Sequence, residues 1–233
     1  MRDEFRNSEN WHNRGYLPHY EANGNYQFIT YRLADSLPQK VLKDLPALEA
    51  PLSTIKNNLG APLSSAAKEV AVERRKYVES HLDKGWGSCL LREPEVAGKV
   101  IEAWKYFDDI KYDLIAYVVM PNHVHLLIKN YEGVKLGDCV RSWKLFVSNF
   151  VSKNERLRMK FLGHVEVEGA AQESNASKKF TVWQREYWDR FIRDEKHFNK
   201  SVNYIFNNPV KAGLCKTIQD WTWSNASEYF REG

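Results

Sequence analysis

Two histidines, His123 and His125, stand one residue apart in the segment VVMPNHVHLLI. In a β-strand, residues i and i+2 share a face, so both imidazoles are expected to project from the same side. Two neutral imidazoles held that close could bind one divalent metal ion. The alternative is a pair of hydrogen-bonded strand residues without a metal. Polar residues are out of pattern in so apolar a strand, which favours a site, and two ligands would still need a third.

A tyrosine and an asparagine at helical spacing, Tyr204 and Asn208, occur in the segment SVNYIFNNPVKAG. Residues four apart lie on the same face of a helix, so a phenol and an amide are offered to one spot. The amide oxygen suits a hard cation such as Mg²⁺ or Mn²⁺, and the phenol could attack a phosphorus centre polarised by that cation. The alternative is structural: a boundary tyrosine, and an asparagine that ends a helix before Pro209.

The elements that must position these residues follow from hydrophobic periodicity. Strands are expected at 25–34 and 112–120 and again from His123, with Pro121 and Asn122 forming the turn of a hairpin. Helices are expected at 65–85, 93–108, 136–153 and 194–213, the last of them stopped by Pro209. Strand, helix, strand, strand, helix and a last helix indicate an α+β protein: an antiparallel sheet covered by helices, similar to the ferredoxin-like split βαβ pattern.

The chain of 233 residues is long enough for one substantial core, and we expect a single domain, 1–233. Residues from about 38 to 85 resemble a helical insertion, and the small polar stretch at about 165–179 is expected to be a flexible loop. The aromatic tail WTWSNASEYF is expected to pack back on the domain.

Composition excludes several classes of protein. No apolar run is long enough to span a membrane, and the polar N-terminus is unlike a signal peptide, so a cytoplasmic location is expected. The three cysteines are far apart and form no C-x-x-C, which argues against a disulfide framework or a zinc ribbon. A net charge of +4 is only mildly basic. Eight tryptophans, several beside arginine, suit either stacking on single-stranded bases or an ordinary aromatic core.

The segments MPNHVHLLI and VNYIFNNPVKAGL together resemble the single-tyrosine HUH transposases, and within them the REP-associated tyrosine transposases. HUH denotes histidine, a bulky hydrophobic residue and histidine, which here are His123, Val124 and His125. The family's tyrosine matches Tyr204, and its third metal ligand, four residues later, matches Asn208. The segments RGYLPHYE, WQREYWDRFIRDEKHF and TWSNASEY resemble regions that flank these motifs, so the resemblance spans most of the chain.

This resemblance implies an HUH domain with a separate tyrosine-bearing helix, acting as a single-strand DNA endonuclease and strand transferase in transposition. Tyr204 would attack the scissile phosphate and form a 5′-phosphotyrosine, which a 3′-OH can later reverse. The implied metal is Mg²⁺ or Mn²⁺, bound by His123, His125 and Asn208, since an amide ligand without nearby cysteine argues against zinc. The implied partners are palindromic hairpin DNA of the REP type and no membrane, in a bacterial protein associated with the nucleoid when bound to DNA. Monomer and homodimer stay open.

DNA-binding residues are less sharply indicated. By the same resemblance Arg14 and His19 lie in a segment that could hold a short single-stranded recognition sequence, and the position of Lys211 after the tyrosine helix suits a phosphate contact. Gln184 and Arg185 are further candidates, and an ordinary surface role is the alternative for each. Two other functions stay open: a non-cleaving DNA-binding protein on the same scaffold, and a metal-dependent hydrolase that uses water, with Tyr204 structural.

Overall fold

The computed structural model describes residues 11–13, 18–20, 25–43, 65–167 and 181–231. Its centre is a four-stranded sheet of β3 (Tyr26–Arg32), β4 (Tyr112–Val119), β5 (His123–Asn130) and β6 (Trp188–Phe191). The spatial order is β4-β5-β3-β6, and each neighbouring pair is antiparallel.

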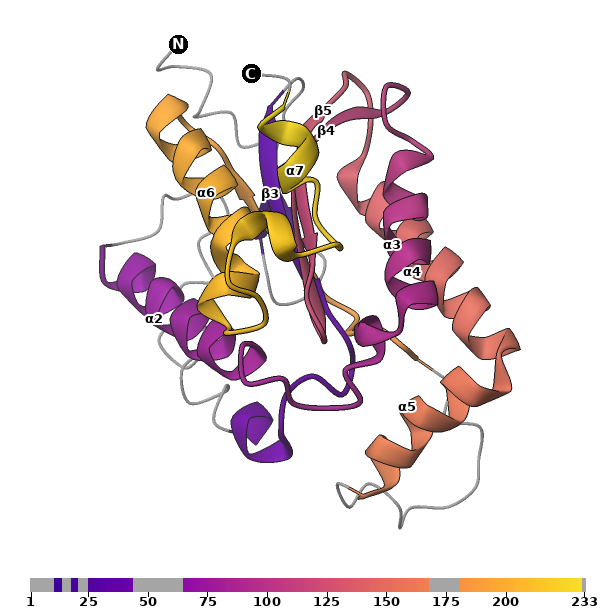
Figure 1. Cartoon of the computed structure of the whole chain (residues 1–233). Coiled ribbons are helices and arrows are strands. Elements are labelled where there is room, and N and C mark those ends of the chain that lie inside the picture. Colours follow the sequence, from indigo (N-terminus) through magenta and orange to yellow (C-terminus); the bar gives the residue numbers. More distant parts are fainter. Residues whose placement is uncertain (1–10, 14–17, 21–24, 44–64, 168–180, 232–233) are drawn as a thin grey trace.

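This strand order is that of a ferredoxin-like fold, as the sequence predicted. Helix α3 (Pro94–Lys105) connects β3 to β4, and α4 (Leu136–Lys153) leads from the β4–β5 hairpin toward β6. The chain therefore runs βαββαβ, with the first and third strands paired at the centre of the sheet. Helices α3 and α4 cover one face of the sheet, and α6 (Glu195–Lys211) covers the other (Figure 1).

Strict alternation along the strands divides the core between these two faces. In β5, Val124, Leu126 and Ile128 pack toward α3 and α4, whereas Leu127 packs toward α6. From α6, Val202 and Ile205 complete the second core. Both faces are thus apolar, which explains why β4 and β5 carry nearly continuous hydrophobic sequence instead of a half-polar pattern.

Helix α6 begins at an N-cap and continues through its proline. The Asp194 side chain accepts a hydrogen bond from the backbone N–H of His197, 2.7 Å away. The prediction that Pro209 stops the helix is wrong, because the helix extends to Lys211. The actual stop is Gly213, whose φ of 70° places it in the left-handed region.

Hydrogen bonds at this terminus form a Schellman motif. The N–H of Leu214 donates to the carbonyl of Pro209, and the N–H of Gly213 donates to that of Val210. Pro209 lacks the N–H that would donate to the carbonyl of Ile205, whereas the capping bonds satisfy carbonyls of the last turn. Asn208 consequently keeps a helical position directly above the last turn.

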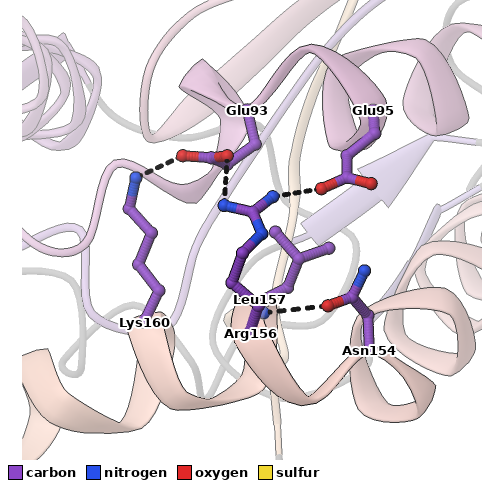
Figure 2. Close-up of polar contacts among 6 residues, drawn as sticks. All are labelled: Glu93, Glu95, Asn154, Arg156, Leu157 and Lys160. Atoms are coloured by element: carbon purple, nitrogen blue, oxygen red, sulfur yellow. Dashed lines mark hydrogen bonds and ion pairs between the residues drawn. The ribbon is translucent and has the colours of Figure 1, made fainter.

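Helix α5 (Glu155–Val167) follows α4 and was not predicted. Asn154 caps it by accepting from the N–H of Leu157, and Arg156 and Lys160 pair with carboxylates at the start of α3 (Figure 2). The Arg156 guanidinium lies 2.8 Å from a Glu93 oxygen. Since α5 extends to Val167, the loop predicted from about 165 can begin only after it, and 168–180 lie outside the described residues.

The remaining described elements are peripheral to the sheet. Residues 39–43 are helical, and α2 (Ser65–Leu82) contributes to a small separate cluster with Leu37 and Val41. The described part of the predicted 38–85 insertion is therefore helical. Short elements complete the chain: the hairpin β1 (Trp11–Asn13) and β2 (Pro18–Tyr20), the 3-10 turns η3 (Leu90–Arg92) and η4 (Ile218–Asp220), and α7 (Ala226–Tyr229). No helix in the described ranges is both long and apolar enough to cross a membrane.

Trp104 and Trp143 belong to a buried aromatic network that is joined by hydrogen bonds. Trp104 donates through Nε1 to the Tyr31 hydroxyl at 2.9 Å, and Trp143 donates to the Tyr112 hydroxyl at 3.1 Å. The Tyr112 hydroxyl in turn donates to the carbonyl of Trp104 at 2.6 Å. Every polar end in this group has a partner, so these rings serve the core.

The C-terminal tail closes the outer edge of the sheet, as expected. The backbone N–H of Val119 donates to the carbonyl of Trp223, and Trp221 donates through Nε1 to the carbonyl of Val119. The side chain of Asn225 accepts from the N–H of Tyr117 and donates to the carbonyl of Ile115. Edge groups of β4 are thereby satisfied within the chain.

Replacing Asn225 by alanine should lower the free energy of unfolding by about 2 kcal/mol, because a buried and a partly buried backbone group lose their partners. Urea denaturation followed by circular dichroism measures the change. Asn207→Ala is the matched control, since Asn207 is exposed and bonds only within its own helix. Equal stability of the two variants would contradict this role of Asn225.

Candidate active site

Strand register places both histidines on the face of the sheet that α6 covers. His125 lies opposite Thr30 on β3 and Val118 on β4, and His123 lies opposite Arg32. Both imidazoles are almost fully buried, at 1% and 0% exposure. The predicted sharing of one face is confirmed, and the two rings meet edge to face with centroids 4.8 Å apart.

The tautomer of His123 follows from the residue before it. The Asn122 Nδ2 donates to the carbonyls of Leu82 and Trp86, at 3.2 and 3.0 Å. The amide oxygen of Asn122 therefore faces the other way, 2.8 Å from His123 Nδ1. Because that oxygen only accepts, Nδ1 must carry the proton, and the lone pair of His123 is on Nε2.

The charge state of His123 also suits a metal ligand. Burial lowers its pKa to about 3, and the nearby Arg32 guanidinium contributes in the same direction. The imidazole is accordingly neutral at physiological pH, and metal coordination requires this neutral form.

His125 is oriented from the neighbouring strand. Its Nδ1 lies 2.7 Å from Thr30 Oγ1, within hydrogen-bond distance. Asn122 and Thr30 thus hold equivalent nitrogens of the two rings, which is how residues behind metal-binding histidines fix ring orientation. Sequence reasoning assigned Asn122 only to a turn and did not single out Thr30, because a cross-strand partner depends on register.

Tyr204 comes to this place from a helix about eighty residues later in the chain. Its ring is half-buried and lies edge-on to His125, with centroids 5.2 Å apart. Phe28 contacts both rings, at 5.5 Å from His125 and 5.8 Å from Tyr204. These aromatic contacts place the phenol beside the histidine pair.

Helix α6 runs antiparallel to β5 across this face. Near its start, the ring of Phe198 lies 5.0 Å from that of Tyr26, which pairs with Lys129 at the far end of β5. Six residues later, Tyr204 lies against His125. Moving toward the C-terminus of the helix therefore means moving toward the N-terminus of β5.

The same direction carries Asn208 toward His123. One helical turn beyond Tyr204 is an advance of about 6 Å, close to the spacing of two strand residues. At the end of the helix, Lys211 Nζ lies 3.9 Å from the carboxylate of Asp83, directly after α2. The last carbonyl of α2 is one of those that hold the turn before His123.

The amide of Asn208 is buried without a hydrogen bond to any residue that the structure describes. The residue is 2% exposed, and neither its oxygen nor its nitrogen has a partner within the described part of the chain. A buried amide in this condition costs about 1–3 kcal/mol unless something else binds it. Within the described ranges, no cluster of three or more histidine, cysteine, aspartate or glutamate side chains is placed so that it could hold a metal ion.

The chain is similar to known proteins over half its length. It is 27% identical over 116 residues to a REP-associated tyrosine transposase of Escherichia coli K12, and equally identical, also over 116 residues, to a Haemophilus influenzae protein assigned the same name. These matches cover 50% and 49% of this chain, and 55% and 58% of the relatives, so the chain spans little more than half the length of each. The chain is a sequence relative of the REP-associated tyrosine transposases.

Other comparisons are less informative. An uncharacterised Haemophilus influenzae protein is 30% identical over 124 residues, which are 50% of this chain and 66% of that protein. A solved REP-associated tyrosine transposase bound to a REP hairpin has a TM-score of 0.46 and 17% identity, over 93% of this chain and 82% of the other. No protein-family model matches.

The residues predicted to contact DNA are dispersed. Arg14 lies outside the described residues, and of His19 only the backbone is described, in β2. Gln184 and Arg185 are on an irregular segment beside β3. The backbone carbonyls of these two residues accept hydrogen bonds from Lys144 Nζ. No part of the comparison with the REP-associated tyrosine transposases tests these residues, so their roles stay predictions.

Lys211 and Lys144 have other partners in the structure. Lys211 is exposed and paired with Asp83, so a phosphate contact by Lys211 also stays a prediction. Burial lowers the pKa of Lys144 to about 7, which Glu186 opposes and Arg32 assists. Sequence reasoning did not identify Lys144, whose three carbonyl contacts hold the 184–186 segment in place.

Thr30→Val should reduce Mn²⁺ affinity by about tenfold, because the isosteric change removes the hydroxyl that orients His125. Isothermal titration calorimetry measures the affinity. Thr30→Ser keeps the hydroxyl and is the matched control, with an affinity near that of the wild type. If Thr30→Val binds Mn²⁺ as tightly as Thr30→Ser, the orienting role is wrong.

Asn208→Leu should have opposite effects on stability and metal binding. Without metal, an isosteric apolar side chain removes a buried amide that has no described partner, and the free energy of unfolding should rise by about 1 kcal/mol. If Asn208 is the third ligand, as the sequence predicts, Mn²⁺ binding should weaken at least about tenfold. Urea denaturation in EDTA and calorimetry with Mn²⁺ measure the two changes, and a less stable Asn208→Leu protein would show that the amide has a structural partner.

Proposed function

We propose that this chain cleaves and rejoins single-stranded DNA at hairpins through a covalent link to Tyr204. The observation that carries the proposal is the contact of the Tyr204 ring with His125, 5.2 Å between centroids, beside a second imidazole. A phenol there, next to two neutral nitrogen ligands, is suited to attack on a phosphate held by a cation.

The substrate class is supported by the relatives. Two of them are named for REP, a class of palindromic DNA, and for a tyrosine transposase activity. A palindromic single strand folds into a hairpin, so hairpin DNA is the substrate we propose for this chain.

The metal we propose is Mg²⁺ or Mn²⁺, held by Nε2 of His123, by His125 and by the amide oxygen of Asn208. The donor set fits because His123 is neutral and offers a lone pair, and because the amide has no described hydrogen-bond partner. When bound, the cation would polarise the scissile phosphate and offset its charge.

The protein's own residues would carry out a balanced transesterification. The Tyr204 oxygen forms a bond to phosphorus and loses its proton to solvent, while the bond from phosphorus to the 3′ oxygen breaks. The leaving oxygen takes up a proton and becomes a 3′-OH. An ordinary tyrosine has a pKa of about 10, so a nearby cation is needed to favour the phenolate at neutral pH.

Strand joining follows from the same chemistry. The tyrosine–phosphate ester has nearly the same energy as the phosphodiester that it replaces, so a 3′-OH can attack it and release Tyr204. The half-buried phenol beside two buried imidazoles excludes much of the water that would otherwise hydrolyse this link.

Tyr204→Phe should abolish covalent attachment to DNA and leave DNA binding within about twofold, because only the nucleophilic oxygen is removed. The full chain is incubated with labelled hairpin oligonucleotides whose single-stranded foot is randomised, with Mn²⁺, and adducts are resolved on a denaturing gel. Tyr26→Phe, on the same face of the sheet, is the matched control and should form adduct at the wild-type level.

The outcomes separate the competing functions. An adduct in the wild type and in Tyr26→Phe, lost in Tyr204→Phe and in EDTA, supports the proposal. Cleavage that survives in Tyr204→Phe would instead identify a hydrolase that uses water. Tight hairpin binding without cleavage in any variant would identify a non-cleaving DNA-binding protein.

A further inference from the structure

Arg32 occupies the position beside His123 on the candidate-site face. It is the last residue of β3, and its register partner on β5 is His123. Directly opposed residues in an antiparallel pair project to the same face, so the Arg32 side chain leaves the sheet on the side of the two histidines. The guanidinium is close enough to interact electrostatically with His123, since it helps to lower the pKa of that imidazole.

The guanidinium is anchored at one point. Arg32 Nη1 donates to Ser36 Oγ at 3.0 Å, and the Ser36 hydroxyl donates to the carbonyl of Leu33 at 2.7 Å. This is the only side-chain hydrogen bond of Arg32 among the described residues. A guanidinium has five N–H donors, so the bond to Ser36 positions the group and leaves other N–H donors able to bind an anion.

No carboxylate in the described part of the chain forms an ion pair with Arg32. The nearest acid in sequence, Asp35, accepts instead from the N–H of Ser88, 2.6 Å away. A second cation, Arg74 of α2, lies close enough to repel it. Burial and then this repulsion lower the Arg32 pKa to about 10, so the guanidinium stays charged at neutral pH.

A half-buried cation beside a second cation costs free energy in the isolated protein. Among the described residues, the one side-chain hydrogen bond of Arg32 is to Ser36, whose hydroxyl also bonds to the backbone. The arrangement is favourable when an anion enters the site. Arg32 is also adjacent to the predicted DNA-contacting segment, since its carbonyl accepts from the N–H of Gln184.

We propose that Arg32 binds the scissile phosphate of the DNA strand, beside the cation position defined by His123 and His125. The proposal rests on the function proposed above and names a catalytic residue that the motif residues do not include. Its planar donors suit the non-bridging phosphate oxygens, and the charge on these oxygens grows as the phenol attacks. The guanidinium would thus hold the phosphate for in-line attack and stabilise the transition state, with bonds made and broken as written for Tyr204.

Three variants test the proposal: Arg32→Gln, Arg32→Lys and the control Lys129→Gln. Lys129 is on the same face of β5 but about 20 Å from His123 by the strand rise, so the control changes the same charge away from the site. Thermal unfolding verifies that each variant folds. If Arg32→Gln does not fold, Arg32→Lys still tests the proposal, because it retains the charge and most of the packing.

The first measurement is the single-turnover rate of adduct formation with the hairpin oligonucleotide pool and Mn²⁺. Arg32→Gln should be slower by about 100-fold, as is typical when one donor to a developing oxyanion is removed. Arg32→Lys should lose about tenfold, because it keeps the charge but not the planar fork. Lys129→Gln should stay within about twofold.

The second measurement needs no catalysis. Binding of the same oligonucleotides is measured in EDTA, in a Tyr204→Phe background, over a range of salt concentrations. Removing one phosphate contact to a single strand should lower the slope of log K against log salt by about 0.7 in Arg32→Gln and leave it unchanged in Arg32→Lys.

The two measurements distinguish failure of this proposal from failure of the proposed function. If the wild type forms no adduct, the function fails, and the salt slope alone decides whether Arg32 binds a phosphate. If the wild type forms adduct but Arg32→Gln is as fast as Lys129→Gln, the assignment of Arg32 is overturned and the function stands. A slower rate with an unchanged salt slope would also overturn it, since that indicates a structural role.

Discussion

The packing of α6 on one face of the sheet is the constraint on which the candidate site depends. Val202 and Ile205 are buried against Phe28 and Leu127, and this apolar contact determines the rotation of the helix. Given that rotation, Tyr204 must meet His125, because successive helix residues are separated by about 100°. A rotation by one residue would replace the phenol with the side chain of Asn203 or Ile205. The hydrophobic core of this layer therefore positions the polar groups that would do the chemistry.

Such a site is maintained at the expense of stability. His123 is buried in its neutral form beside a cation, and Asn208 is buried without a described hydrogen-bond partner. The burial of the Asn208 amide is unfavourable by an amount comparable to a lost hydrogen bond, about 1–3 kcal/mol. A well-packed apolar side chain at position 208 would serve the fold better, and the cation that we propose there would offset the cost. The stabilising contacts lie elsewhere, in the aromatic network around Trp104 and the closed β4 edge.

Much of this arrangement could be predicted from the sequence because periodicity reports which side of an element is buried. The hairpin, the pair of histidines on one face and the apolar stripe of α6 all follow from periods of two and 3.6 residues. The predicted helix end at Pro209 was wrong. A proline usually ends a helix, whereas here the proline lies two residues before the end, which is the Schellman motif around Gly213. Helix α5 was missed because its apolar pattern is weak and ion pairs with Glu93 hold it in place.

Contacts between strands could not be predicted in the same way. Arg32 and Thr30 become neighbours of the histidines only through the pairing of β3 with β5, and a shift of one residue would send both to the other face. The apolar sequence of β5 is compatible with either register. What decides is the joint requirement that Ile29 and Tyr31 enter the core under α3 and α4. The neighbours of the histidines are thus set by residues on the opposite side of the sheet.

The region predicted as an insertion is coupled to the candidate site by the same logic. The end of α2 and the turn after it supply the two carbonyls, of Leu82 and Trp86, that orient the Asn122 amide. That amide fixes the tautomer of His123. Asp83, which follows Leu82 in the sequence, pairs with Lys211 at the end of α6. A peripheral segment therefore contacts both halves of the site, the strand with the imidazoles and the helix with the phenol. Displacing α2 would change the direction of a lone pair without touching either histidine, so α2 belongs to the structure that orients the site.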